Sequence, residues 1–272
     1  MLKYCNDLHV HTNLSVCAPR YSYAENYIPY CKQENVRVIG FTDHVYIKER
    51  MQAEHPDFKG TPGEYPALLR EEVEELREQN KDLKILLGCE AEVIYGRNFD
   101  VTFEESKNYD YVALAPSHIL NLGNLYSGMD FSTPEKLRAF MLERFKSACK
   151  IKLAVPTVIC HPLYPILSEF EQQVVDGITD SELGECFDLA RENDKAIEIH
   201  ACLYRKGTKC NRDGLSPSYL RILGIAKECG CKFYMGSDAH QLNGFVGAHE
   251  KLMKACEYLG IVEENLWELG RA

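Results

Sequence analysis

The sequence lacks the features of membrane, secreted and nucleic-acid-coating proteins. Its longest apolar runs are far shorter than the roughly 20 residues that a membrane-spanning helix needs. No signal peptide, with its charged segment and apolar core, begins at Met1. The formal net charge of -10 disfavours the long basic face that neutralises a nucleic-acid backbone. We therefore expect a cytoplasmic protein that binds no membrane, and the charge argues against nucleic acid as a partner.

The sequence also lacks the usual devices of covalent and nucleotide chemistry. It has no serine nucleophile elbow and no glycine-rich loop of the kind that cradles nucleotide phosphates. Its 12 cysteines include no C-x-x-C pair, only Cys229-x-Cys231, so a closed structural zinc site has little support. A chain of 272 residues needs no disulfide staples. We expect the cysteines to be reduced and mostly buried.

Apolar runs of strand length recur along the chain, and several are followed by a stretch of helical period. We predict strands at 4–11, 36–42, 84–93, 109–115, 157–160, 196–200 and 232–236. We predict helices near 24–34, 64–79, 134–150, 181–193 and 217–229, with more helix after Gly247. This alternation is typical of an α/β barrel and predicts a single domain over residues 1–272. With seven strands, the barrel should be distorted or incompletely closed, and long loops at 45–66, 119–133, 163–179 and 202–216 should partly cover one end.

The histidines are concentrated where the predicted strands end. Seven of the nine lie at the carboxyl end of a predicted strand or just beyond it: His9, His11, His44, His118, His161, His200 and His240. Only His55 and His249 do not. The carboxyl ends of barrel strands converge on one face, where active sites are built. A single such histidine is most simply a core or capping residue, but seven gathered without a metal would carry a large desolvation cost. The pattern therefore predicts a metal centre.

The spacing of the candidate ligands supports a metal centre. His9 and His11 are two residues apart on a strand, so both side chains point to the same side of the sheet and can bind one ion. The predicted strand 84–93 has no histidine at its end but contains Glu90. We choose Glu90 as a bridging carboxylate, with Glu92 as the fallback. Imidazole combined with carboxylate suits zinc, manganese or iron, and the sequence does not choose among these metals.

The ordered motifs resemble one known family. They are His9-x-His11, Thr42-Asp43-His44, Gly88-x-Glu90, Ser117-His118, His161-Pro162 and Ser237-Asp238-Ala239-His240. Together they resemble the PHP family, named for polymerase and histidinol phosphatase domains, over nearly the whole chain. Each motif alone is weak, whereas the ordered set is very specific. The resemblance implies a distorted (β/α)7 TIM-like barrel that binds two or three divalent metal ions and hydrolyses phosphate esters.

The resemblance also implies a metal for each matched residue. A first metal would be bound by His9, His11, Glu90 and Asp238. Glu90 would be shared with a second metal, which His118 and His161 would also bind. A third metal would take His44 and His240.

Two positions depart from the family pattern. Cys17 stands where many members have a further histidine or aspartate, and it is either a thiolate ligand of the third metal or an ordinary cysteine with a weak or absent contact. The sixth strand ends Glu198-Ile199-His200, where similar proteins often read Glu-Ile-Asn. His200 is an extra ligand, a proton donor or a group that orients a ligand, and we do not assign it to a metal.

The segment 204–212 concentrates four positive charges in an otherwise acidic chain. Its Arg205-Lys206-Gly207 motif resembles the loop after the same strand in histidinol-phosphate phosphatases. Because a guanidinium group binds phosphate through two parallel hydrogen bonds, we predict Arg205 as a phosphate ligand. Lys206 and Arg20 are weaker candidates for the same role. The simpler alternative for each charge is a solvated basic loop.

The predicted function is hydrolysis of a small phosphomonoester, with L-histidinol phosphate as one candidate, by a hydroxide that bridges two or three Zn, Mn or Fe ions. Arg205 would compensate charge in the transition state. A proton for the leaving oxygen would come from Asp238, His240 or His200, which the sequence does not rank.

Three alternatives remain open at the level of sequence. One is an exonuclease or other phosphodiesterase of the same family, acting on nucleic acid or on small molecules. A second is a barrel amidohydrolase that cleaves a C–N bond. Such enzymes usually rely on a metal-bridging lysine, and no predicted strand ends in a lysine here. The third is a non-catalytic metal-binding regulatory protein. The oligomeric state is not predicted.

Overall fold

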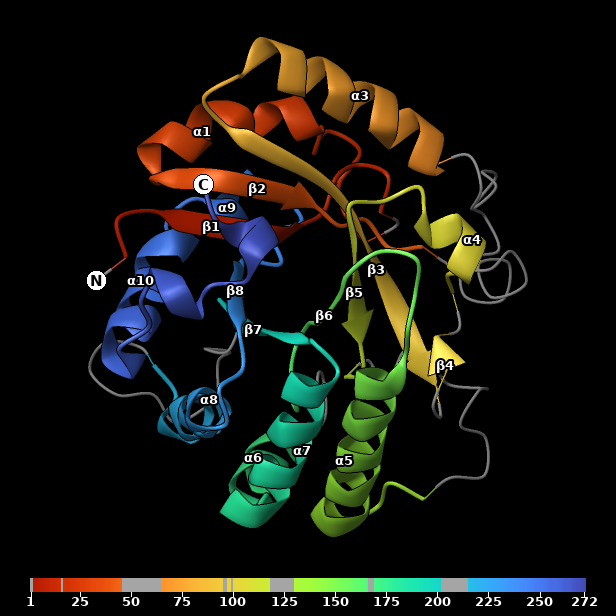
Figure 1. Cartoon of the computed structure of the whole chain (residues 1–272), viewed down its shortest axis with the longest axis vertical. Coiled ribbons are helices and arrows are strands. Elements are labelled where there is room, and N and C mark those ends of the chain that lie inside the picture. The colour runs from red at the N-terminus through yellow and green to blue at the C-terminus, as the bar shows by residue number, and fades with distance from the viewer. Residues whose placement is uncertain are drawn as a thin grey trace.

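A computed structural model describes residues 2–15, 17–45, 65–94, 97–98, 100–117, 130–165, 169–201 and 215–272. In these residues seven parallel strands follow one another in chain order around a strongly curved sheet, drawn from red to blue in Figure 1. They are β1 (Cys5–Val10), β2 (Val36–Phe41), β3 (Lys84–Ile94), β5 (Tyr111–Ala115), β6 (Thr157–Ile159), β7 (Ala196–His200) and β8 (Phe233–Gly236). A short strand, β4 (Arg97–Asn98), pairs antiparallel with the end of β3. The seven predicted strands are therefore all confirmed.

The barrel nearly closes where β8 returns to β1. Backbone bonds join the two at their carboxyl ends, where Asp238 N donates to His9 O at 2.8 Å and His11 N donates to Ala239 O at 2.9 Å. Farther down the seam, Met235 N donates to the Asn6 side-chain Oδ1 at 2.7 Å, so a side chain takes the place of a backbone acceptor. This seam is the distortion expected of a seven-stranded barrel.

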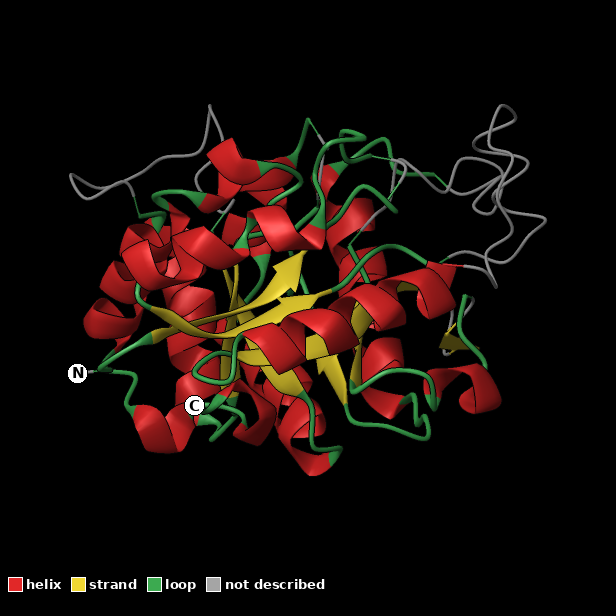
Figure 2. Ribbon diagram, turned by 90° about the horizontal axis from the view of Figure 1, so that it is seen from above, coloured by secondary structure: helices red, strands yellow, loops and turns green. Residues whose placement is uncertain are grey.

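Helices surround the strands (Figure 2). They are α1 (Ile28–Gln33), α3 (Tyr65–Gln79), α4 (Phe103–Ser106), α5 (Pro134–Lys150), α6 (Glu171–Gly177), α7 (Asp180–Glu192), α8 (Pro217–Glu228), α9 (Leu242–Phe245) and α10 (Ala248–Leu259). Thr133 accepts a hydrogen bond from the backbone N–H of Lys136 at the start of α5, and Thr179 forms a reciprocal capping box with Glu182 at the start of α7. These local signals explain why both helices begin within one residue of their predicted starts.

Some elements differ from the sequence predictions. The predicted loop 163–179 contains α6, and the predicted helix 24–34 is divided into a 3-10 turn, Ala24–Asn26, and α1. The four-residue helices α4 and α9 and the two-residue strand β4 are too short to show a period in sequence. Ser216 precedes α8 but forms no side-chain cap bond, so the start of α8 relies on the φ angle that Pro217 fixes.

No helix in the described ranges is long and apolar enough to span a membrane.

Tyr111 fills the centre of the barrel. Its strand, β5, is not a neighbour of β1, yet the Tyr111 hydroxyl donates to Leu8 O on β1 at 2.7 Å, so the ring crosses the interior. A Cβ atom at Gly40 would lie 2.2 Å from the Tyr111 hydroxyl, and one at Gly88 would lie 2.6 Å from Tyr111 Cζ. Glycine at these two strand positions therefore makes room for the ring, which forms a packed floor beneath the strand ends.

Among the residues that the structure describes, Arg144 on α5 is one of the largest side chains that the fold buries completely. Its guanidinium donates to Val93 O at 2.7 and 3.0 Å and pairs with Glu92 Oε2 at 3.4 Å. The ion pair therefore joins the end of β3 to the helix that packs against it.

Replacing Arg144 by methionine should lower the free energy of unfolding by about 3–5 kcal/mol, because it leaves the buried Glu92 carboxylate without its guanidinium. The double variant R144M/E92Q should recover part of this loss, because the charge is removed as well. Urea unfolding followed by circular dichroism measures both. A loss below about 1 kcal/mol in R144M would show that this ion pair does not hold β3 against α5.

Candidate metal centre

Eight side chains with imidazole or carboxylate groups converge at the carboxyl ends of the barrel strands. They come from β1, β3 and β7 and from the residues that follow β1, β2, β6 and β8: His9, His11, His44, Glu90, His161, His200, Asp238 and His240. All eight are predicted site residues. The barrel geometry therefore gathers groups that lie as far apart in the sequence as residues 9 and 240.

Glu90 lies between two groups of histidines. Its Oε2 atom is 3.4 Å from Nε2 of both His9 and His11 and 3.1 Å from Nδ1 of His44. Its Oε1 atom is 3.6 Å from Nδ1 of His161. The two oxygens of one buried carboxylate thus face different imidazoles, which is the position a bridging ligand requires. Glu92, the fallback choice, faces Arg144 instead.

Asp238 forms the second carboxylate of the cluster. Its Oδ1 atom is 3.1 Å from Nε2 of His11, and its Oδ2 atom is 3.4 Å from Nε2 of His200 and 3.7 Å from Nε2 of His161. Burial alone would raise its pKa, but the neighbouring imidazoles of His11, His161 and His200 hold the pKa of Asp238 well below its ordinary value. Asp238 is therefore an anion that faces several imidazoles at once.

The imidazoles differ in how readily they take up a proton. Burial lowers the pKa of His9, but the nearby carboxylates of Glu198, Glu90 and Asp238 outweigh it and raise the pKa. Burial lowers the pKa of His161, and burial together with His11 lowers that of His240 to about 4. His161 and His240 are consequently neutral near pH 7, with lone pairs that a metal ion can accept.

Glu198 on β7 was not among the predicted site residues, although it is fully buried beside them. Its Oε1 atom lies 2.7 Å from Nδ1 of His9, and its Oε2 atom accepts a hydrogen bond of 2.7 Å from the backbone N–H of His161. Burial would raise its pKa, but His200 and His9 keep the pKa of Glu198 below its ordinary value. Glu198 thereby orients His9 so that Nε2 faces Glu90 and Asp238. The sequence signal that could have identified Glu198 is a charged residue between two isoleucines in a buried strand.

Asp43 has a similar supporting role. Its carboxylate accepts hydrogen bonds from Thr12 N at 2.7 Å, from Thr12 Oγ1 at 2.6 Å and from Ser15 Oγ at 2.6 Å. Ser15 Oγ lies in turn 2.9 Å from Nδ1 of His11. Asp43 therefore holds the loop after β1 and, through Ser15, the ring of His11.

Two of the converging residues have left-handed backbone conformations. His161 has a φ angle of 43° and Asp238 one of 54°, values that cost free energy for residues other than glycine. The bonds from His161 N to Glu198 and from Asp238 N to His9 O hold these two turns in place. Backbone strain thus coincides with the residues that direct side chains into the cluster.

The donor atoms fit a metal ion. In the described part of the chain, the fully buried Nε2 atoms of His9 and His11 have no hydrogen-bond partner, which is costly unless a cation accepts their lone pairs. Four overlapping groups of donors have their atoms within 4.8 Å of one another: His11, Cys17, His44 and His240; His9, His161, Glu198 and His200; His9, His11 and Glu90; and Glu90, Cys160 and His161. Nitrogen, oxygen and sulfur donors at this spacing suit zinc and neighbouring transition metals.

Cys17 is brought into the first of these donor groups. Its Sγ atom lies 3.0 Å from Nε2 of His240. Eight of the ten described cysteines are buried, as predicted, whereas Cys17 is exposed. Cys17 therefore lies beside His11, His44 and His240 at the edge of the cluster.

The remaining predicted residues are not placed at the cluster. Arg20 follows β1 and is exposed. His118, Arg205 and Lys206 lie outside the described residues. His249, which the sequence pattern set apart from the site, lies 2.9 Å from Asp7 Oδ2 through its Nε2 atom and so ties α10 to β1.

Gly236 on β8 leaves the space that Glu198 and His9 occupy. A Cβ atom at Gly236 would lie 2.0 Å from Glu198 Oε1 and 2.7 Å from His9 Cβ. The variant G236A should therefore displace both groups and weaken metal binding at least about tenfold. In the matched control G184A on α7, a Cβ atom meets nothing within 4 Å, and binding should be unchanged.

Elemental analysis after equilibrium dialysis against graded zinc concentrations measures the zinc affinity of both glycine variants. Should G236A prove poorly folded by circular dichroism, E198Q tests the same contact with almost no change of shape. Wild-type zinc binding in a folded G236A or in E198Q would contradict the positioning role of Glu198.

Comparisons with known proteins agree with the barrel fold. Residues 7–201 match the PHP domain. The fold is similar to that of histidinol phosphate phosphatase (HisK) from Lactococcus lactis subsp. lactis Il1403, solved with zinc, L-histidinol and phosphate, at a TM-score of 0.64 and 18% identity over 96% of this chain and 95% of that one. A proposed histidinol phosphatase, HisK from Listeria monocytogenes, gives a TM-score of 0.62 at 14% identity over 90% of this chain and 98% of that one. No curated protein sequence gives a significant match. Because the family match spans more than half of the chain, the protein belongs to the PHP domain family.

Proposed function

We propose that the chain, as one domain over residues 1–272, is a metal-dependent phosphatase that hydrolyses a small phosphomonoester. The observation that carries this proposal is the convergence of imidazoles around the two carboxylates of Glu90 and Asp238 at the active-site end of the barrel. The net charge of -10 disfavours a nucleic-acid substrate.

L-Histidinol phosphate is the leading candidate substrate. The Lactococcus lactis enzyme, which has a similar fold, was solved with L-histidinol and phosphate. The motif Arg205-Lys206-Gly207 supports the same choice, with Arg205 as the main phosphate ligand and Lys206 and Arg20 as additional cations.

The proposed cofactor is a group of two or three Zn, Mn or Fe ions. The first ion would be held by His9, His11, Glu90 and Asp238, the second by Glu90, His118 and His161, and the third by Cys17, His44 and His240. When bound, these ions supply Lewis acidity, which lowers the pKa of water and offsets the charge of the phosphate oxygens.

Other side chains of the protein orient the metal-binding histidines, and one side chain delivers the proton that the leaving oxygen needs. Glu198 holds Nδ1 of His9, and Ser15 holds Nδ1 of His11, so each Nε2 atom is directed into the cluster. His240 has both ring nitrogens near partners, with Nδ1 2.9 Å from Asp238 O and Nε2 3.0 Å from Cys17 Sγ. We therefore favour His200, whose Nε2 lies 3.4 Å from the Asp238 carboxylate, as the group that delivers a proton to the leaving oxygen, with Asp238 orienting its ring.

The two glutamates of β3 provide a matched test of activity. The protein, purified without a metal-affinity tag, should release phosphate from L-histidinol phosphate and from p-nitrophenyl phosphate, and a chelator should abolish turnover until zinc or manganese is returned. E90Q should lower kcat/KM at least about 100-fold because it removes the bridging anion. E92Q, which changes the partner of Arg144, should retain most of the activity.

Three results would contradict the proposed function: turnover that survives chelation, equal loss in folded E90Q and E92Q, or faster hydrolysis of bis(p-nitrophenyl) phosphate than of the monoesters. The last result would favour a phosphodiesterase.

Cobalt spectroscopy tests the role of Cys17 without relying on activity. A thiolate bound to Co²⁺ gives an intense sulfur-to-metal charge-transfer band in the near ultraviolet. We expect this band in the cobalt-loaded protein and its loss in C17S, together with the loss of about one ion per chain. C229S, which changes a partly buried cysteine whose thiol faces Gly184 O on α7 at 3.9 Å, should keep both. An unchanged band in C17S would make Cys17 an ordinary cysteine.

A further inference from the structure

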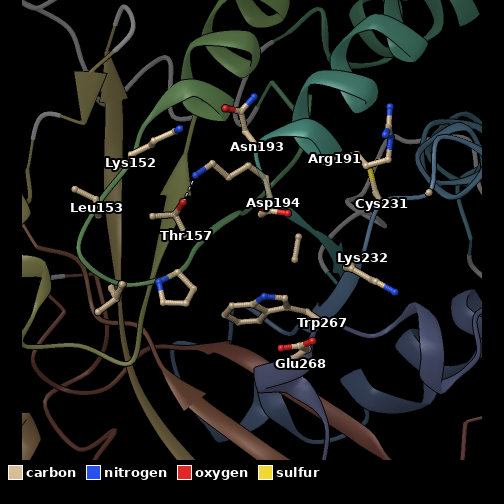
Figure 3. Close-up of a pocket in the computed structure, with 15 residues that line it drawn as sticks. Lys152, Leu153, Thr157, Arg191, Asn193, Asp194, Cys231, Lys232, Trp267 and Glu268 are labelled. Atoms are coloured by element: carbon tan, nitrogen blue, oxygen red, sulfur yellow. Dashed lines mark hydrogen bonds between the residues drawn. The ribbon is translucent and has the colours of Figure 1, made fainter.

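A cavity of about 670 Å³ lies at the amino ends of the barrel strands, opposite the metal centre (Figure 3). Three successive helix-to-strand connections line it, those that follow α5, α7 and α8, and each contributes one lysine: Lys152, Lys195 and Lys232. Trp267 and Glu268, near the end of the chain, form another wall. The volume lies within the range of about 300–1,000 Å³ that is usual for small-molecule sites.

The charge of this cavity is opposite to that of the chain. The formal net charge of the protein is -10, yet the cavity is lined by three lysines, Lys152, Lys195 and Lys232, and by Arg191, which pairs with Asp188 at 3.1 Å, against the two carboxylates of Asp194 and Glu268. Local positive charge in an acidic protein attracts anions to the place where it is concentrated.

Lys195 is the buried member of these cations, with an exposed fraction of 5%. Its amine donates to Ile151 O at 2.7 Å and to Thr157 Oγ1, both of which are neutral acceptors. Within the described ranges, no carboxylate lies within ion-pair distance of this amine. Burial lowers the pKa of Lys195 to about 8. A buried ammonium group without a counter-charge is costly, and an anion placed in the cavity would reduce that cost.

Trp267 gives the cavity an aromatic surface. Its indole ring packs edge-on against Tyr111, with centroids 5.7 Å apart, and lies 6.4 Å from the ring of Tyr234. Its backbone N–H donates to Phe233 O at 2.7 Å, so both the chain and the ring are held against the barrel floor. A fixed, half-buried indole that lines a cavity offers a flat surface on which a planar ring can stack.

We propose that this cavity binds a small anion that carries a planar ring, with a phosphate or carboxylate group beside Lys195 and the ring against Trp267. The site is distinct from the metal centre, because β7 separates them: Lys195 precedes its first residue, and His200 is its last. The two sites can therefore be occupied together.

Trp267 is the only tryptophan of the chain, so its fluorescence reports directly on the cavity. In chelator-treated protein, adenosine 5′-monophosphate or benzoate should change this fluorescence saturably, and uncharged adenosine should bind at least about tenfold more weakly than its monophosphate. K195M should weaken binding of the anion at least about tenfold. E90Q should leave binding unchanged, which separates this site from phosphate binding at the metal centre.

Two further variants complete the test. K146M changes a lysine that pairs with Glu185 outside the cavity and should bind like the wild type. K232Q changes an exposed lysine of the cavity and should weaken binding about threefold even if K195M folds poorly. The proposal is overturned if neither anion gives a saturable change, if adenosine binds as tightly as its monophosphate, or if folded K195M or K232Q binds like the wild type.

Discussion

The gathering of buried carboxylates and imidazoles at one end of the barrel is the constraint on which the rest of the structure depends. Such groups cannot leave water unless their charges are balanced. Among the protein's own groups, protons supply the balance: three carboxylates raise the pKa of His9, and four histidines lower the pKa of Asp238. Divalent ions would take the place of those protons, so metal binding at this centre should release protons.

The surrounding structure holds these groups against their mutual repulsion and strain. Glu198 joins β7 to β1 and to the turn after β6, while Asp43 holds the loop that carries Ser15. Tyr111 closes the barrel beneath the cluster, where glycines leave room for its ring. Packing and hydrogen bonds at the strand ends thus orient the side chains of the metal centre. The opposite end of the barrel holds a cavity that is lined by lysines and Trp267.

Local signals in the sequence predicted much of this arrangement. Apolar runs located all seven strands, stretches of helical period located the starts of α5 and α7 to within one residue, and the histidines at strand ends marked the cluster. The role of Glu198 was missed because its contact with His9 joins residues 189 positions apart, which no local period reports. For Cys17 the sequence left two alternatives open, and only the folded chain shows that its Sγ atom lies beside His240.

The most direct test of the metal centre is anomalous X-ray diffraction from crystals of the zinc-loaded protein, measured on both sides of the zinc absorption edge. We expect two or three zinc peaks among the donors at the strand ends, one of them between Glu90 and the His9-x-His11 pair. A well-ordered barrel with no zinc peak at these residues, or with zinc bound only elsewhere, would contradict a PHP-type metal centre in this chain.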